Sequence, residues 1–337
     1  MSRVVCFGEL LLRLSAPAHE LPFQSPHLEA RFGGAEANVA ASLAILGHRS
    51  AMVSALPENA AGRACAGELR RHGVDTSGVH FADGRMGLYF LTPGAMQRPA
   101  EVTYDRAGSV FALAKAASHD WPRLLAGASW LHLSGINLAL GDEPARAALA
   151  ALEAAYTAGI AISFDCNHRE KLWGPRATRA PALLRRVLAM ADLVFGNERD
   201  LALILETQFP QADGDQRFHA AATAAFANFP RLRWLASTSR QQHDAVTQQL
   251  HGLLATRDGF LTTRPHRLDH IVDRIGSGDA FAAGLLHGSL TDLPEQQALD
   301  FATAAACLKH SIPGDVNLLR AADMQAFLAR DGFDVQR

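Results

Sequence analysis

The sequence predicts an α/β protein built on a mostly parallel sheet with helices on both faces. Short apolar runs of β type alternate with longer alanine-rich stretches along most of the 337 residues, and this alternation is typical of consecutive βαβ units. Hydrophobic residues make up 48% of the chain and charged residues 20%, so the chain can bury a sizeable core. Its length is near that of two average domains, although α/β folds often run this long as one unit.

The predicted elements follow one another in βα order. Residues 4–7 have the pattern of a strand, and residues 36–46 that of a helix closed by Gly47, because glycine readily adopts the backbone conformation that ends a helix. A second helix covers 60–71 and ends at Gly73. The later predicted elements are strands at 162–164, 193–195 and 234–236 and helices at 183–190, from about 199, and at 218–229.

One region interrupts this order. Residues 85–106 contain two β-rich segments around a connection with Pro and Gly, and together with residues 12–32 they predict a small β element beside the main sheet. Ligands of open α/β sheets bind at the carboxyl ends of the strands, so an element over that edge would act as a lid. The alternative is an additional antiparallel edge of the main sheet.

Charge and cysteine content exclude several classes of partner and site. The 32 Lys and Arg residues against 34 Asp and Glu give a formal net charge of -2, and no basic run exceeds Arg70-Arg71-His72. A nucleic-acid or anionic membrane partner is therefore not expected. The four cysteines, Cys6, Cys65, Cys166 and Cys307, form no Cys-x-x-Cys pair, which argues against a zinc site or a disulfide framework.

The sequence lacks the patterns of export and membrane insertion. Its first apolar run contains Glu9 and has no small-residue cleavage site, which is typical of a strand rather than a signal peptide. The most apolar stretch, 124–141, is interrupted by His132, Ser134 and Asn137, so it is not a membrane span. We therefore expect a cytoplasmic protein.

The strongest chemical motif is Asp273-Arg274-Ile275-Gly276-Ser277-Gly278-Asp279, which an apolar helical pattern follows. A glycine-rich turn at the start of a helix presents backbone N–H groups to an anion. Asp279, where the turn meets the helix, is either a helix cap or a general base that meets a hydroxyl beside a phosphate. No Gly-Lys-Ser/Thr follows, so the motif is not a Walker A loop, and it also differs from GxGxxG.

A second motif, Gly33-Gly34-Ala35-Glu36-Ala37-Asn38, opens the first predicted helix. Paired glycines let a ligand approach the backbone closely, and the Asn38 amide offers a donor and an acceptor to a hydroxyl. Taken alone, such a segment is more often an ordinary junction between a loop and a helix.

Together the two motifs resemble the two signatures of the ribokinase-like (PfkB) sugar kinases, and the likeness covers nearly the whole chain. The resemblance implies one domain, 1–337, with a three-layer α/β sandwich, a mostly parallel sheet and a small β-sheet lid at about 9–32 and 85–107. It implies ATP as phosphoryl donor with Mg²⁺, Asp279 as the base, and an anion hole from the backbone amides of Gly276, Ser277 and Gly278. Such a site suits phosphoryl transfer, which depends on positioning and charge neutralisation.

Within this family, the segments 33–38, 85–90, 104–106 and 165–173 resemble 2-keto-3-deoxygluconate kinases. A sugar acid carries a carboxylate, which guanidinium groups bind in a bidentate way. The residues that the resemblance puts in the substrate pocket are Gly34, Ala35, Glu36, Ala37, Asn38, Tyr89, Tyr104, Asp105, Arg106, Arg169, Asp279 and Asp315.

Several of these assignments have alternatives. Arg169 would otherwise be a structural ion pair at a strand end, Arg106 a solvated surface arginine, and Asp315 part of a surface turn. Fructokinases also resemble the run 165–169, so that run does not decide between a neutral sugar and a sugar acid. The lid sequence and Glu36 favour the sugar acid.

The nucleotide and metal residues follow from the same resemblance. Asn197, Thr238 and Ser239 would contact ATP, and Asp200 stands in the Glu position of the Asn-x-x-Glu magnesium motif, with Glu198 as the alternative. The segment 237–242 departs from the glycine-richer nucleotide loop of the family. Asp273 and the carbonyl of Ile275 resemble a site for a monovalent cation such as K⁺, although Asp273 would equally cap the turn.

These observations predict an ATP-dependent kinase that phosphorylates the 6-hydroxyl of 2-dehydro-3-deoxy-D-gluconate. The alternatives are a fructokinase-type enzyme with the same base and anion hole, and a sensor of sugar or nucleotide that keeps the fold without transfer. The expected partners are a small sugar acid and ATP, with no nucleic acid and no membrane. The resemblance is also compatible with a homodimer formed through the lids.

Overall fold

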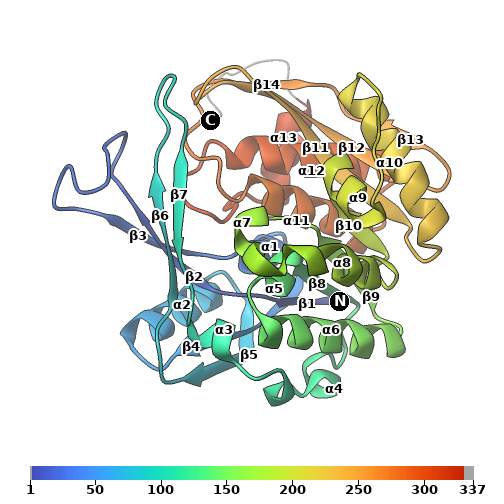
Figure 1. Ribbon diagram of the computed structural model, residues 1–337. Coiled ribbons are helices and arrows are strands. Elements are labelled where there is room, and N and C mark those ends of the chain that lie inside the picture. The colour runs from blue at the N-terminus through green and yellow to red at the C-terminus, as the bar shows by residue number, and fades with distance from the viewer. Residues whose placement is uncertain (1, 330–337) are drawn as a thin grey trace.

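The computed structural model describes residues 2–329 and contains a larger and a smaller sheet (Figure 1). Within these residues the larger sheet consists of β1 (Arg3–Phe7), β4 (Arg49–Pro57), β5 (Asp75–Ala82), β8 (Trp130–Ser134), β9 (Ala161–Asp165), β10 (Leu193–Phe195), β11 (Trp234–Gln242), β12 (Gln248–Thr256), β13 (Phe260–Thr262) and β14 (His266–Leu268). Its order is β13-β12-β11-β10-β9-β8-β1-β4-β5, with β14 also paired to β12. The strands from β11 to β5 in this order are parallel, and β12 pairs antiparallel with β11, β13 and β14. The predicted mostly parallel sheet is confirmed.

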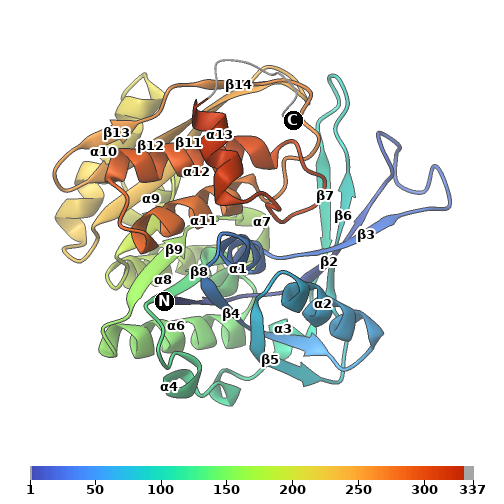
Figure 2. The same ribbon diagram turned by 180° about the vertical axis from the view of Figure 1, so that it is seen from behind.

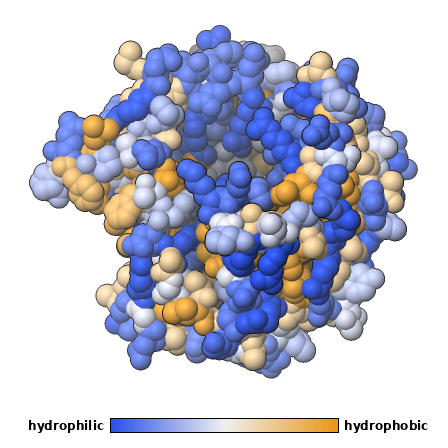
Figure 3. Space-filling view, viewed as in Figure 1, coloured by the Kyte–Doolittle hydropathy of each residue, from blue (hydrophilic) through white to orange (hydrophobic). Residues whose placement is uncertain are grey.

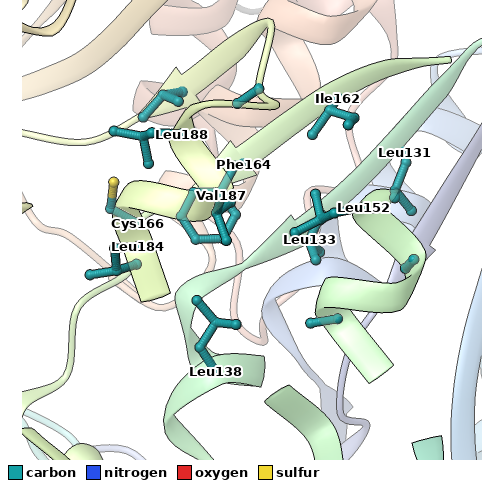
Figure 4. Close-up of a cluster of buried hydrophobic side chains, with 14 of the residues drawn as sticks. Leu131, Leu133, Leu138, Leu152, Ile162, Phe164, Cys166, Leu184, Val187 and Leu188 are labelled. Atoms are coloured by element: carbon teal, nitrogen blue, oxygen red, sulfur yellow. The ribbon is translucent and has the colours of Figure 1, made fainter. Parts of the chain in front are cut away.

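Both faces of this sheet are buried. Along β1, Val5 and Phe7 belong to one core cluster and Val4 and Cys6 to another, because successive side chains of a strand point to opposite faces. Figure 4 shows part of the first cluster, in which side chains of β8 and β9 pack against helices. Such double burial accounts for the continuous apolar runs in the sequence.

Helices cover the two faces and complete three layers (Figure 2). On the side of the first cluster lie α3 (Val110–Leu113), α4 (Trp121–Leu124), α5 (Gly135–Ala139), α6 (Asp142–Thr157), α7 (Glu170–Trp173), α8 (Ala180–Leu188), α9 (Glu198–Leu205) and α10 (Gly214–Asn228). On the other side lie α1 (Ala35–Ile45), α2 (Ala60–Arg71), α11 (Ser277–Leu290) and α12 (Glu295–Lys309), with α13 (Ala321–Ala329) packed on α12. Short 3₁₀ segments cover Ala116–Ser118 and Gly174–Arg179.

The smaller sheet stands beside the larger one and confirms the β element predicted from 12–32 and 85–106 (Figure 1). Its strands, in spatial order, are β3 (Glu29–Gly33), β2 (Leu11–Ser15), β6 (Gly87–Thr92) and β7 (Glu101–Asp105). Leu11, Tyr89 and Leu91 form a buried cluster against Ile275. One face of the smaller sheet therefore packs on the turn that precedes α11.

Two further observations concern membranes and thiols. No helix within residues 2–329 combines the length and apolar character that a membrane crossing requires. All four cysteines are buried and carry free thiols. Burial raises the pKa of Cys65 to about 12, so its thiol is unreactive at neutral pH.

Candidate active site

A cavity of about 830 Å³ lies between the two sheets. Glu9 after β1, Ile136 after β8 and Asp165 at the end of β9 line it from the larger sheet, and Tyr89 and Tyr104 line it from the smaller one. The space-filling view shows a hollow here that is surrounded mostly by hydrophilic residues (Figure 3). The cavity thus occupies the carboxyl edge of a parallel sheet, where α/β proteins bind ligands.

The first turn of α11 forms one wall. Gly276 is the N-cap with φ 79° and ψ 0°, a left-handed conformation that favours glycine, and any side chain there would clash with the backbone carbonyl of Asp315. At Gly278, in contrast, an added methyl group would meet no atom within 4 Å. Gly276, Ser277 and Gly278 line the cavity, and a helix start leaves its first N–H groups without helical partners. This geometry suits the predicted anion hole.

Asp279 follows in the same turn and joins the two sequence motifs. Asn38 Nδ2 donates a hydrogen bond to Asp279 Oδ2 at 2.6 Å, so α1 and α11 meet at the cavity. Desolvation raises the pKa of Asp279 to about 8, with the charges of Asp165, Asp315 and Glu36 acting in the same direction and the Asn38 hydrogen bond opposing them. A carboxylate with a pKa near neutral is suited to accept a proton from a hydroxyl.

Glu36, Asp165, Asp200 and Asp315 are among the further acids that line the same cavity. Burial raises the pKa of each, and that of Asp165 to about 7. Glu36 is 1% exposed and accepts a hydrogen bond from Asn137 Nδ2 at 2.9 Å, so it lies in the floor of the cavity. Such a concentration of perturbed acids is typical of a functional site.

The smaller sheet contributes Tyr89, Tyr104 and Arg106. Arg106 lies 5.3 Å from the Tyr104 ring centre, and its Nε donates to Glu9 Oε2 at 2.7 Å. Asp105, between them in sequence, is paired with Arg85 at 2.8 Å and does not line the cavity, because alternate residues of β7 face opposite sides. The structure therefore brings two of the three predicted residues of this segment to the cavity and leaves Asp105 outside.

Arg169 follows β9 in the chain and lines the cavity. Its Nη1 donates to the carbonyl of His168 at 3.2 Å, and no carboxylate within the described residues lies within 4 Å of its guanidinium. The guanidinium is thus available to an anionic group, whereas that of Arg106 already has a carboxylate partner.

Asp315 reaches the cavity from the turn after α12. It is 4% exposed, and its two oxygens accept hydrogen bonds from Tyr89 Oη and from Arg13 Nη1, the latter at 2.9 Å. Asp315 is therefore buried rather than part of an exposed turn. Its bonds connect the smaller sheet to the turn after α12.

The cavity lining includes the residues predicted for the nucleotide. Asn197 caps α9, and its backbone N–H donates to Asp200 Oδ2 at 2.8 Å, which completes a capping box. Thr238 and Ser239 on β11 also line the cavity. Glu198 also lines the cavity but lies 3.8 Å from the guanidinium of Arg217.

Two predicted residues besides Asp105 lie outside the cavity lining. Ala37 points into the core beneath α1, and Asp273 is buried beside the turn before α11. Gly34, Ala35 and Ile275 do line it.

Three residues at or beside the cavity were not predicted from the sequence: Glu9, Arg13 and Arg240. Arg240 lies near the helix start, with Nη2 donating to Ser277 Oγ at 3.3 Å, and desolvation followed by the charge of Arg274 lowers its pKa. Arg240 lies in the segment 237–242, which departs from the glycine-richer nucleotide loop of the family. An arginine in a segment expected to contact ATP was the signal that could have identified it. Glu9 and Arg13 gave no signal because they lie far in sequence from their partners Arg106 and Asp315.

Comparison with known proteins agrees with this architecture. The pfkB family of carbohydrate kinases matches residues 1–321. The crystal structure of 2-dehydro-3-deoxygluconokinase from Thermotoga maritima is similar with a TM-score of 0.93 and 36% sequence identity, covering 98% of this chain and 100% of that chain.

Two curated relatives have other names. The 2-dehydro-3-deoxygalactonokinase of Haloferax volcanii is 31% identical over 327 residues, which are 97% of this chain and 96% of the relative. Fructokinase-2 of Solanum habrochaites is 30% identical over 289 residues, 84% of this chain and 80% of the relative.

Proposed function

This chain belongs to the pfkB family of carbohydrate kinases, and we propose that it transfers the γ-phosphoryl group of ATP to the 6-hydroxyl of 2-dehydro-3-deoxy-D-gluconate. The observation that carries the proposal is the position of Asp279. Its carboxylate, with a pKa raised to about 8 by desolvation, lies in the first turn of α11, next to the N–H groups of an anion hole. A base and an anion site in one helical turn suit the transfer of a phosphoryl group to a hydroxyl.

In this mechanism Asp279 accepts the hydroxyl proton while the sugar oxygen forms a bond to the γ-phosphorus and the bond from that phosphorus to the ADP oxygen breaks. Asn38 holds the carboxylate in place through its hydrogen bond of 2.6 Å. The N–H groups of Gly276, Ser277 and Gly278 stabilise the negative charge on the transferring group. The guanidinium of Arg240 adds a positive charge at the same helix start.

Magnesium bound to the ATP phosphates would neutralise part of their charge. Within residues 2–329 no group of three or more His, Cys, Asp or Glu side chains is arranged to hold a metal by itself, so the ion would depend on the phosphates for most of its ligands. Carboxylate oxygens are the ligands Mg²⁺ prefers. Asp200 fits better than Glu198, because Asp200 engages one oxygen with Asn197 while Glu198 faces Arg217.

The proposed substrate class is supported by Arg169, which lines the cavity and forms no ion pair within 4 Å among the described residues, although its charge acts at longer range on Asp165 and Asp200. A guanidinium that faces a cavity without a carboxylate partner binds an anionic ligand group in a bidentate way, and a sugar acid has such a group. Tyr104 offers its ring and hydroxyl to the rest of the sugar, and Tyr89 lies beside it with its hydroxyl bonded to Asp315. The likeness to the 2-dehydro-3-deoxygluconokinase of Thermotoga maritima supports the same substrate.

A second candidate is the galactonate epimer of this sugar acid, which the relative from Haloferax volcanii favours. The two acids share the carboxylate and the terminal hydroxyl, so Arg169 and Asp279 serve either one. A fructokinase activity would use Asp279 alone and leave Arg169 without a ligand.

The test is ADP release from Mg-ATP with 2-dehydro-3-deoxygluconate, its galactonate epimer and fructose offered in parallel. We expect kcat/KM for the gluconate to exceed that for fructose by about 100-fold or more, which corresponds to about 2.7 kcal/mol. A preference for fructose would retain the kinase and remove Arg169 from the substrate site. Binding of ATP without turnover of any sugar would instead favour a sensor.

A further inference from the structure

Arg13, Asp273 and Lys309 lie almost wholly away from water, with 4%, 7% and 0% of their surfaces exposed. Charged groups buried to this degree are costly unless each has a partner. The resemblance to sugar kinases implies a monovalent cation held by Asp273 and the carbonyl of Ile275, and Arg13 lies 2.7 Å from Asp273. Whether a metal ion fits there depends on which donors the carboxylate already has.

Asp273 is already engaged by protein donors. Its Oδ1 accepts the backbone N–H of Ile275 at 3.0 Å, and its Oδ2 accepts the backbone N–H of Gly314 at 2.9 Å. Arg13 Nη2 lies 2.7 Å from the same Oδ2. A carboxylate offers about four lone-pair positions, so these three donors leave little capacity for a metal ion.

Arg13 connects Asp273 to a second acid. Its Nη1 donates to Asp315 Oδ1 at 2.9 Å and its Nε to Ser15 Oγ at 2.7 Å. Burial alone would lower the pKa of Arg13, but the carboxylates of Asp273 and Asp315 outweigh it and raise that pKa. The guanidinium is therefore a permanent positive charge between the two carboxylates.

Lys309 is a second internal cation. It lies in the last turn of α12, and its Nζ donates to the carbonyl oxygen of Ile312 at 3.0 Å. Burial lowers the pKa of Lys309, while Asp273 and Asp315 act in the opposite direction, so the ammonium lies within electrostatic reach of both acids. Two cations thus balance two carboxylates.

A role as a helix cap does not account for Lys309 by itself. Lysines near the C-terminus of a helix do bond the last carbonyls, but their ammonium groups normally remain in water. Lys309 has none of its surface exposed. Its burial therefore points to a role toward Asp273 and Asp315.

We infer that Lys309, together with Arg13, supplies the positive charge that a monovalent metal ion would provide at this position, so that phosphoryl transfer does not require such an ion. The inference rests on the proposed kinase function. The connection to the reaction is short, because the backbone N–H groups of Val272 and Asp273 donate to the carbonyl of His310 at 2.9 and 3.2 Å, and Gly276 packs against the carbonyl of Asp315. The two internal cations therefore hold the turn that presents the anion hole.

The first experiment measures turnover and melting temperature of the full-length protein in potassium, sodium and tetramethylammonium chloride at equal ionic strength. We expect kcat to agree within about twofold across the three salts and the melting temperature to be independent of the cation. A potassium-specific gain of about tenfold in kcat, or a potassium-specific rise in melting temperature, would overturn the inference. The melting temperature shows whether potassium stabilises the protein even if no sugar is turned over. Failure of the proposed function is therefore distinguishable from failure of this inference.

A pair of variants tests Lys309 directly. Lys309→Ala removes the ammonium and leaves space, whereas Lys309→Met removes the charge and fills that space. We expect potassium chloride, but not tetramethylammonium chloride, to restore kcat and melting temperature in Lys309→Ala and to leave Lys309→Met impaired. A folded Lys309→Ala that does not respond to potassium would make Lys309 only a cap. If Lys309→Ala does not fold in any salt, the wild-type salt series decides.

Discussion

For a general base, the protonation state of one carboxylate sets the pH range of activity. In the proposed mechanism Asp279 must be deprotonated to accept the hydroxyl proton, and desolvation raises its pKa to about 8. We therefore expect kcat/KM to increase as the pH rises through about 8, instead of through the ordinary aspartate range near 4. The measurement is a pH profile of kcat/KM at saturating Mg-ATP.

Two variants separate this explanation from a general loss of structure. Asp279→Asn keeps an acceptor for Asn38 and is expected to fold while losing roughly 100-fold or more in kcat. Asn38→Ala removes the hydrogen bond that lowers the pKa of Asp279, so the rise of the profile should move to higher pH. Near-normal turnover by Asp279→Asn would remove Asp279 from the chemistry.

Arg169 gives a second prediction for a single residue. Arg169→Lys keeps the charge and loses the planar fork, so KM for the sugar acid should rise about tenfold while KM for ATP stays within about twofold. Initial rates with each substrate varied in turn measure both constants. Arg85→Lys is a matched control, because Arg85 pairs with Asp105 outside the cavity. Equal losses for the two substrates would make Arg169 a structural residue.

At the scale of one element, the first turn of α11 contains two glycines with opposite requirements. Gly276→Ala imposes a left-handed conformation on alanine and a clash with a backbone carbonyl, and should lower the melting temperature, with a cost of about 1 kcal/mol or more. Gly278→Ala meets no protein atom within 4 Å and should melt like the wild type. Its methyl group faces the cavity, so KM for ATP should rise. Thermal unfolding and initial rates of both variants test this, and equal melting temperatures would contradict it.

The elements also mark where sequence reasoning succeeds. The strand at 193–195 and the helix at 60–71 were predicted with the bounds that β10 and α2 have, because period and a terminal glycine are local signals. The strand predicted at 234–236 continues to Gln242, since its second half pairs with β12, a partner that a short apolar run does not reveal.

The same limit applies to the site. Gly276 to Asp279 and Asn38 were found because each motif is contiguous. Arg13 and Asp315 are separated by 302 residues and meet only through the fold, so no spacing in the sequence indicates their contact.

For the whole molecule, the acids of the cavity oppose folding when they are charged. The pKa values of Asp165 and Asp279 rise from an ordinary 3.8 to about 7 and about 8 in the folded state, first through burial. The folded state therefore binds more protons than the unfolded state, and the resulting stabilisation is lost as the pH rises through this range. We expect the melting temperature of the ligand-free protein to fall between about pH 4 and about pH 8.

Asp279→Asn supplies the control for this pH effect. The amide does not titrate, so the variant should melt above the wild type at about pH 8 and approach it at about pH 4. Parallel curves for the two proteins would show that Asp279 does not carry the charge cost.

The chain passes between the two sheets at four places: at Glu9, at Gly34, through 83–86 and through 106–109. Any rotation of the smaller sheet has to turn at these crossings, and three of them contain residues that line the cavity, namely Glu9, Gly34 and Arg106. The segments at which the smaller sheet would turn thus also contain residues of the cavity lining. In the proposed kinase, a substitution at one of these three residues is therefore expected to change sugar binding and product release together.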